Sequence, residues 1–328
     1  MNVHWTKLEP FLLVWLCFFG ACVGSFLNVV IFRLPRRCLS VFSPSRSFCP
    51  KCHHAIRWYE NLPIISWLVI LRGRCAGCAQ PISARYPSVE LVVTLAFMFL
   101  AWRDLVGRWD QPEAWAIYAV HTTFACAILA CALIDYDLEV IPDAIDLPGT
   151  VLGLIAVTAI PALLGPRLPQ LAAWSAQATL ALESPLAWWG LPASLLAPLE
   201  WVVDLSLRRP TTYPHLCGLA GGMLGAAVGA GFLWVFGRIC SRLVGREALG
   251  LGDVKFMAMV GALTGWQGAL TTILLGSLAG ASLGLSSMLI GALPGRERGA
   301  GMTSTLRFGP FLAGGAAVAA FLPGRVLG

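Results

Sequence analysis

Charged residues are scarce in this chain of 328 residues, where Lys, Arg, Asp and Glu together make up 12% of the sequence. Soluble globular domains carry roughly twice that share, so an ordinary water-soluble surface is excluded. Hydrophobic residues reach 57%, and the mean hydropathy is +0.74. The chain has more apolar side chains than a soluble fold of this length buries, and we predict an integral membrane protein.

Several catalytic and binding signatures are also missing from the sequence. It has no G-x-S-x-G nucleophile elbow and no H-E-x-x-H helix, and no strand, glycine loop and helix unit that would bind a dinucleotide. Of the five histidines, His4, His121 and His215 are scattered singly, as is typical of core or interfacial residues. The net charge of +6 is better explained by membrane orientation than by nucleic-acid binding.

Long apolar runs dominate what is present. A membrane-spanning helix needs roughly 20 mostly apolar residues, and the sequence has eight apolar runs. The sixth is short and is separated from the seventh by two residues only. The eight runs cover residues 10–32, 89–102, 115–134, 144–164, 216–236, 256–263, 266–293 and 308–322. The basic residues of a signal peptide precede its apolar core, whereas Arg33, Arg36 and Arg37 follow the first run, which favours an uncleaved anchor over a signal peptide. We therefore expect an all-α polytopic membrane protein with about eight transmembrane helices and an outer-face insert at about 165–214.

The distribution of Lys and Arg predicts the orientation, because short cytoplasmic loops are enriched in them. With the N-terminus outside, the inner segments carry sixteen basic residues and the outer segments seven. Nine of the sixteen lie in the polar segment from Arg33 to Pro87, which has one acid, Glu60. This segment is therefore expected in the cytosol.

Four cysteines in this segment form two C-x-x-C knuckles, Cys49 with Cys52 and Cys75 with Cys78. Knuckles joined by about 20 residues are typical of a tetrahedral structural zinc site. Two disulfides are the alternative, but they are rare in the reducing cytosol. Zinc is the favoured interpretation, with the neighbouring His53 and His54 as substitute ligands only if a thiolate is not used.

Acidic residues gather at the same predicted membrane face. Five of them lie where the third run ends and the fourth begins, and Asp253 directly precedes the sixth run. The five are Asp135, Asp137, Glu139, Asp143 and Asp146. Two carboxylates held close together share a proton and titrate as a pair, which is the arrangement of aspartic proteases. The alternatives are a helix N-cap for Asp253 and a solvated membrane-edge position for Asp135.

Taken together, the motifs of this sequence resemble those of the bifunctional type IV prepilin peptidases, the leader peptidase/N-methyltransferases of the GxGD aspartic class. The resemblance rests on GSFLNVVIFRLP (24–35), both knuckles, IISWL (64–68), RGRC (72–75), ISARYPSVE (82–90), ID (134–135), IPD (141–143) and GLGDVK (250–255). One departure is Glu60, which stands where the family usually has Asp. The long insert also separates the two catalytic motifs more than is usual.

The resemblance implies cleavage of the basic leader from type IV prepilins and secretion pseudopilins at the cytosolic face of the bacterial inner membrane. It also implies N-methylation of the new N-terminus with S-adenosylmethionine as donor. Asp135 and Asp253 correspond to the protease aspartates, and the four knuckle cysteines to ligands of a structural Zn²⁺. Asn28, Arg33 and Glu90 fall in motifs associated with methylation.

The implied organisation has a first transmembrane helix (1–32), a cytosolic tetra-cysteine domain associated with methylation (33–88) and a membrane-embedded peptidase domain (89–328). The expected partners are the pilin precursors and the lipid bilayer, without nucleic acid, and the oligomeric state stays open. The acids around Asp143 are candidates for holding the basic leader. Two other functions stay open: a transporter or channel with a zinc-ribbon regulatory loop, and a peptidase without methyltransferase activity.

Overall fold

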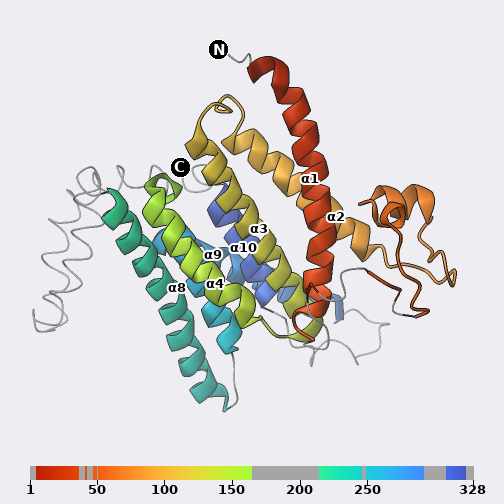
Figure 1. Ribbon diagram of the computed structural model, residues 1–328. Helices are drawn as coiled ribbons and strands as arrows, with labels where there is room; N and C mark the ends of the chain where they lie inside the picture. The colour runs from red at the N-terminus through yellow and green to blue at the C-terminus, as the bar shows by residue number, and fades with distance from the viewer. Residues whose placement is uncertain are drawn as a thin grey trace, which may run out of the picture. The chain divides into compact units, whose positions relative to one another are not determined.

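The computed structural model describes residues 5–36, 41–42, 47–49, 51–164, 214–245, 249–291 and 308–322 (Figure 1). Helices account for nearly all the regular structure in these ranges, and the β-type pairing among them consists of two isolated bridges, Phe48 with Ala55 and Arg74 with Pro81. The predicted outer-face insert lies outside the described residues. The chain divides into two compact units, residues 1–142 and 143–328.

The first unit contains three long helices, α1 (Trp5–Arg33), α2 (Arg85–Asp104) and α3 (Pro112–Leu138). Glycines on α1 let it approach α2 closely: a Cβ added to Gly24 would lie 2.7 Å from the Cα of Glu90, and one on Gly20 would lie 2.9 Å from the Cβ of Phe97. Small residues bring membrane helices together in this way. Between α1 and α2 the chain forms two short helical turns, η1 (Trp58–Asn61) and η2 (Ser66–Ile70).

The second unit consists of α4 (Asp143–Ala159), η3 (Pro161–Leu164), α8 (Pro214–Val244), α9 (Leu251–Gly291) and α10 (Gly309–Phe321). Helices α8 and α9 pack through glycines, because a Cβ on Gly225 would overlap the carbonyl oxygen of Gly261. Their close packing needs both of these positions to lack a side chain. Figure 1 shows α4 and α8 lying side by side within this unit.

Helix α9 breaks at Gly265, whose φ of 72° and ψ of 178° lie outside the helical region. This is the point where the sequence separates the runs 256–263 and 266–293. The backbone conformation there favours glycine, because a Cβ is strongly disfavoured at this φ and ψ. The predicted division of this region is therefore confirmed as a break between two helical segments of α9.

The predicted number of spans is confirmed only in part. Among the described residues, five helices are long and apolar enough to cross a membrane: 8–33, 85–104, 112–138, 214–243 and 251–286. The other two expected spans fall on shorter helices, α4 with 17 residues and α10 with 13. About 20 residues are needed to cross the hydrocarbon, so the spans expected at these two positions stay predictions.

Candidate functional sites

The four cysteines of the segment between α1 and α2 converge on one point. Their sulfur atoms all lie within 4.8 Å of one another. The Cys49 and Cys78 sulfurs are 4.0 Å apart, and those of Cys52 and Cys75 are 3.9 Å apart. A tetrahedral ion with bonds of about 2.3 Å to sulfur requires sulfur atoms about 3.8 Å apart, whereas a disulfide requires about 2.0 Å. The arrangement fits a four-thiolate metal site, and all four cysteines are free.

Both knuckles are built by the same backbone pattern. In the first knuckle, the N–H of Cys49 donates to the carbonyl of His54, and the N–H of His53 donates to the carbonyl of Cys49. In the second knuckle, the N–H of Cys75 donates to the carbonyl of Gln80, and the N–H of Ala79 donates to the carbonyl of Cys75. His53 and Ala79, which follow the second cysteine of each knuckle, have φ near 55°, in the left-handed region, and this conformation turns the chain back toward the first cysteine.

Backbone N–H groups favour the thiolate form of the first ligand. Those of Cys52 and Lys51 point at the Cys49 sulfur and lower the pKa of its thiol to about 6. The two knuckles are also tied to each other, because Lys51 Nζ donates to Gln80 Oε1 over 3.0 Å. Metal binding requires the thiolate form, and these N–H groups favour that form at Cys49.

Glu60 supports the first knuckle from the side. Its carboxylate accepts the backbone N–H of Arg57 over 2.9 Å and lies 3.3 Å from Nε2 of His54, which follows the knuckle. The Arg57 N–H and His54 hold the pKa of the Glu60 carboxyl below its usual range, against the opposing effect of burial. Glu60, the residue that departs from the family pattern, is thus held by contacts with its neighbours in the cysteine segment.

We predict that the purified protein carries one metal ion per chain and that Cys75→Ser removes it, because a neutral hydroxyl cannot replace a thiolate ligand. Elemental analysis of protein purified in detergent measures the stoichiometry. Cys240→Ser is the matched control, since Cys240 is outside the four-cysteine cluster. Equal metal content in the two variants would contradict the site.

Asp135 lies in the last turn of α3, and its side chain is buried. The helix ends just beyond it because Glu139 adopts a left-handed conformation, with φ 56° and ψ 34°, and donates its N–H to the Asp135 carbonyl. A solvated membrane-edge residue would be exposed, so this alternative for Asp135 is wrong.

Asp253 lies in the first turn of α9, in the second compact unit, whereas Asp135 belongs to the first. Within the second unit, Lys255 Nζ donates to Asp143 Oδ1 over 2.7 Å. This ion pair joins the GLGDVK motif to the IPD motif at the start of α4, a contact that the sequence did not predict.

The other acids of the cluster are largely committed to contacts within the protein. Asp137 accepts from Arg85 over 2.6 Å, and Asp143 is paired with Lys255. Asp146 has 0% exposure, so the prediction that it is available to bind a basic leader is wrong. Glu139 is exposed at the end of α3.

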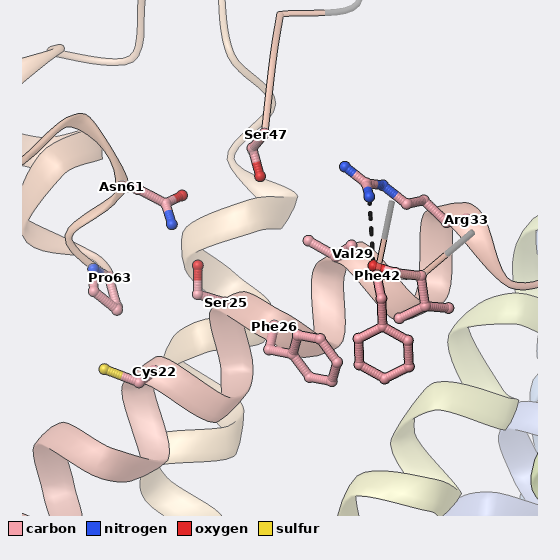
Figure 2. A pocket seen from close by; sticks show the side chains of 10 residues that line it. Cys22, Ser25, Phe26, Val29, Arg33, Phe42, Ser47, Asn61 and Pro63 are labelled. Carbon is pink, nitrogen blue, oxygen red and sulfur yellow. Dashed lines mark hydrogen bonds between the residues drawn. The ribbon is translucent and has the colours of Figure 1, made fainter. Parts of the chain in front are cut away.

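A pair of adjoining cavities, which the sequence did not predict, lies in the first unit between α1, the start of α2 and the cysteine segment. Their volumes are about 420 and 300 Å³, and they share the lining residues Ser25, Val29, Arg33, Ser47 and Asn61. Figure 2 shows Ser25 on α1 opposite Asn61 of the segment, with Arg33 donating to the Val41 carbonyl. Small-molecule sites have volumes in this range.

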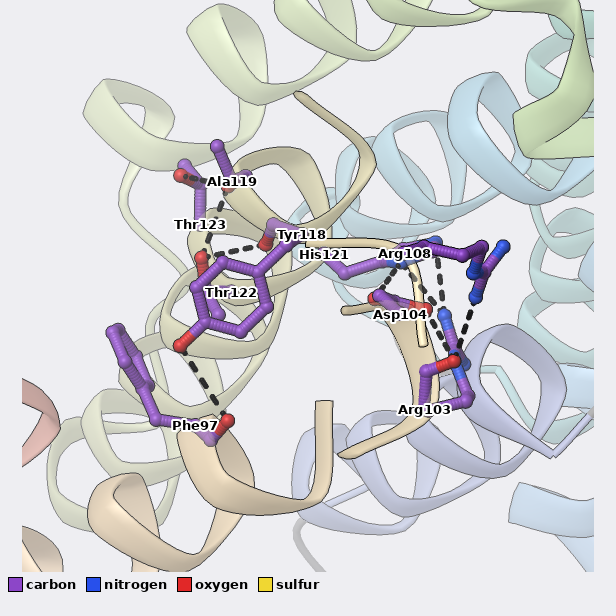
Figure 3. Close-up of polar contacts among 9 residues, drawn as sticks. All are labelled: Phe97, Arg103, Asp104, Arg108, Tyr118, Ala119, His121, Thr122 and Thr123. Carbon is purple, nitrogen blue, oxygen red and sulfur yellow. Dashed lines mark hydrogen bonds and ion pairs between the residues drawn. The ribbon is translucent and has the colours of Figure 1, made fainter. Parts of the chain in front are cut away.

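A buried polar network closes the far end of α2 against α3 (Figure 3). Both oxygens of Asp104 are used: Oδ1 accepts from Arg103 Nε and Oδ2 from His121 Nδ1, each over 2.8 Å. Arg108 donates to the Arg103 carbonyl over 2.8 Å. His121 is buried, as expected of a core histidine, and it is the partner of a buried carboxylate.

We predict that Asp104→Ala lowers the free energy of unfolding by about 3 kcal/mol, because it leaves the partly buried Arg103 and the buried His121 without their carboxylate partner. Thermal unfolding in detergent measures the effect. Asp110→Ala is the control, since Asp110 is exposed in the same connection between α2 and α3. Equal melting temperatures for the two variants would show that the network contributes little.

Comparison with known proteins gives two family matches. The model of the bacterial peptidase A24 N-terminal domain matches residues 18–104, and the model of the type IV leader peptidase family matches residues 184–285. The first match contains the four clustered cysteines and the second contains Asp253. Asp135 lies between the two matched ranges. No solved structure matches the chain.

Several curated proteins named prepilin leader peptidase/N-methyltransferase are similar to this chain over most of their length. The protein from Pseudomonas putida is 33% identical, with 90% of this chain and 85% of the relative covered. The protein from Burkholderia pseudomallei strain 1026b is 32% identical, with 92% of this chain and 82% of the relative covered. The protein from Aeromonas hydrophila is also 32% identical, with 80% of this chain and 78% of the relative covered.

Proposed function

Because the chain belongs to the type IV leader peptidase family, we propose that it cleaves the basic leader from type IV prepilins and pseudopilins and methylates the new N-terminus. The observation that carries this proposal is the similarity to prepilin leader peptidase/N-methyltransferases over nine tenths of the chain. A transporter or channel has no support from these relatives. A peptidase without methylation is the alternative that the experiments below distinguish.

We assign the peptidase chemistry to Asp135 and Asp253. Three observations support the assignment: Asp135 is buried at the end of α3, Asp253 opens α9 within GLGDVK, and the Lys255–Asp143 ion pair joins α4, which follows Asp135 closely in sequence, to the turn that carries Asp253. A carboxylate at the edge of the hydrocarbon is costly and is retained mainly for function.

In the proposed mechanism the two carboxyl groups share one proton over a water molecule. The ionised member takes a proton from the water, and the neutral member donates a hydrogen bond to the scissile carbonyl and polarises it. Water then attacks the carbonyl carbon after the basic leader. We place this chemistry at the cytosolic face of the bacterial inner membrane, in accordance with the distribution of Lys and Arg.

We predict that Asp253→Asn and Asp135→Asn each lower the rate of prepilin cleavage by at least about a hundredfold, because an amide cannot serve as general base. Asn caps a helix about as well as Asp, so a capping role for Asp253 would leave folding and cleavage unchanged. Cleavage is followed by the mobility shift of a prepilin, and folding by thermal unfolding. Asp110→Asn is the control. If one of the two variants cleaved prepilin at the rate of this control, the residue substituted in that variant would have no part in the mechanism.

For the second activity we propose S-adenosylmethionine as the methyl donor and Zn²⁺ as the ion held by Cys49, Cys52, Cys75 and Cys78. Four thiolates in tetrahedral positions suit Zn²⁺, and the sulfur separations support that geometry. The ion has no open ligand position when all four sulfurs bind it, so its role is to fold the segment between α1 and α2. The chemistry of methylation is supplied by the donor.

We predict that chelation, or Cys75→Ser, reduces N-methylation of the processed pilin more than it reduces leader cleavage. The cysteine segment belongs to the first unit, and Asp253 to the second. Mass spectrometry of the mature pilin distinguishes the cleaved from the cleaved and methylated product, with Cys240→Ser as control. A parallel loss of both products would show that the segment is needed for the whole fold.

A further inference from the structure

The two adjoining cavities of the first unit have a floor made by one face of α1. Ser25, Val29 and Arg33 line both of them, and Asn28 and Phe32 line the smaller one. These positions recur every three or four residues, so they lie on one stripe of the helix. The opposite wall comes from the cysteine segment, which contributes Asn61 to both cavities. The space is thus built by the N-terminal helix and the proposed zinc domain together.

Glu90 places a buried carboxylate in the wall of the smaller cavity. Its two contacts are with neutral donors, the backbone N–H of Ile64 over 2.7 Å and the side chain of Ser25. No Lys, Arg or His is paired with Glu90 within the part of the chain that the structure describes. A buried carboxylate without a cationic partner is costly, and a cationic ligand in the cavity would provide one.

The wall beside Glu90 is held in an uncommon backbone conformation. Ile64, which donates to Glu90, has φ 61°, a value that is unfavourable for a β-branched residue. The π-helical turn Ser66–Ile70 follows directly, and such turns are frequent at functional sites. Functional sites are where strain of this kind is concentrated.

The remaining lining residues add aromatic surface and positive charge. Trp67 lines the smaller cavity, and its indole N–H is satisfied by the Ile82 carbonyl over 3.1 Å, so the ring offers an apolar surface. Tyr86 lines the cavity from α2. Arg33 contributes a buried guanidinium shared by both cavities.

We propose that this cavity is the binding site for S-adenosylmethionine, an inference that rests on the proposed methyltransferase function. The donor carries two positive groups, a sulfonium and an ammonium, together with a carboxylate and an adenine ring. Glu90 binds the positive groups, Arg33 binds the carboxylate, and the Trp67 and Tyr86 rings receive the adenine. The cavity thus has a matching group for the positive groups, the carboxylate and the adenine of the donor.

This placement connects the metal site to methylation. Cys49 and Cys75 line the smaller cavity, so loss of the metal would disturb its wall directly. In the transfer, the lone pair of the new N-terminal amine forms the bond to the methyl carbon. The carbon–sulfur bond breaks with its electron pair left on sulfur, and one proton leaves the nitrogen to solvent.

The test measures binding of S-adenosylhomocysteine to the detergent-purified full-length protein by calorimetry. Glu90→Gln removes the charge that faces the ligand, and Val29→Trp fills space shared by the two cavities. We expect each variant to bind at least about tenfold more weakly than wild type. Glu113→Gln is the matched control, because Glu113 is exposed at the start of α3 and lines neither cavity.

A second measurement uses the wild-type protein and does not depend on the folding of a variant. An azido derivative of S-adenosylmethionine is photocrosslinked, and the labelled peptide is identified by mass spectrometry. Label on residues 25–33 or 61–90 supports the site. Label on other residues, or unchanged affinity in both well-folded variants, overturns the proposed site. If the wild-type protein still methylates pilin in that case, the methyltransferase proposal itself is unaffected. Wild type that cleaves prepilin but neither binds the probe nor methylates would refute the methyltransferase proposal itself.

Discussion

A charged side chain near the hydrocarbon of a membrane is stable only where other groups surround it with hydrogen-bond donors or with opposite charge. This constraint explains how the few charges of the chain are used. Asp104 has a donor on each oxygen, from Arg103 and His121, and Asp137 and Asp143 face Arg85 and Lys255. Asp104, Asp137 and Asp143 are therefore structural partners of basic side chains.

Glu90 differs from these acids, because its contacts in the described structure come from neutral groups. It also lines a cavity, and the helix that carries it is held against α1 by the close approach at Gly24. The same packing that brings α1 and α2 together thus sets both the shape of the cavity and the position of its carboxylate. A ligand with positive charge completes this arrangement.

Close packing through glycine recurs in the second unit, where Gly225 meets Gly261 and α9 breaks at Gly265. The break lies shortly after the turn that carries Asp253. Close packing of α8 against the first half of α9 supports that turn, as the catalytic role proposed for Asp253 requires. The ion pair of Lys255 with Asp143 adds a second attachment for the same turn.

Local patterns in the sequence were sufficient for some features of the molecule. Apolar runs predicted helices, because each run buries its own backbone hydrogen bonds without help from distant residues. The spacing of the four cysteines predicted their cluster, since two knuckles of this kind have few other ways to bring thiolates together, and the sulfur positions confirm it. The pairing of Asp135 with Asp253 remains a prediction, because the residues belong to different units.

By itself, the sequence determined the membrane class, the helical runs, the four-cysteine site and the family motifs, because each depends on residues that are near one another or on composition. Only the tertiary structure decided that Asp104 pairs with His121, that Asp146 is buried and that a cavity forms beside Glu90. These features depend on which faces of separate helices and loops meet. That choice is made by packing between distant segments, which no local pattern specifies.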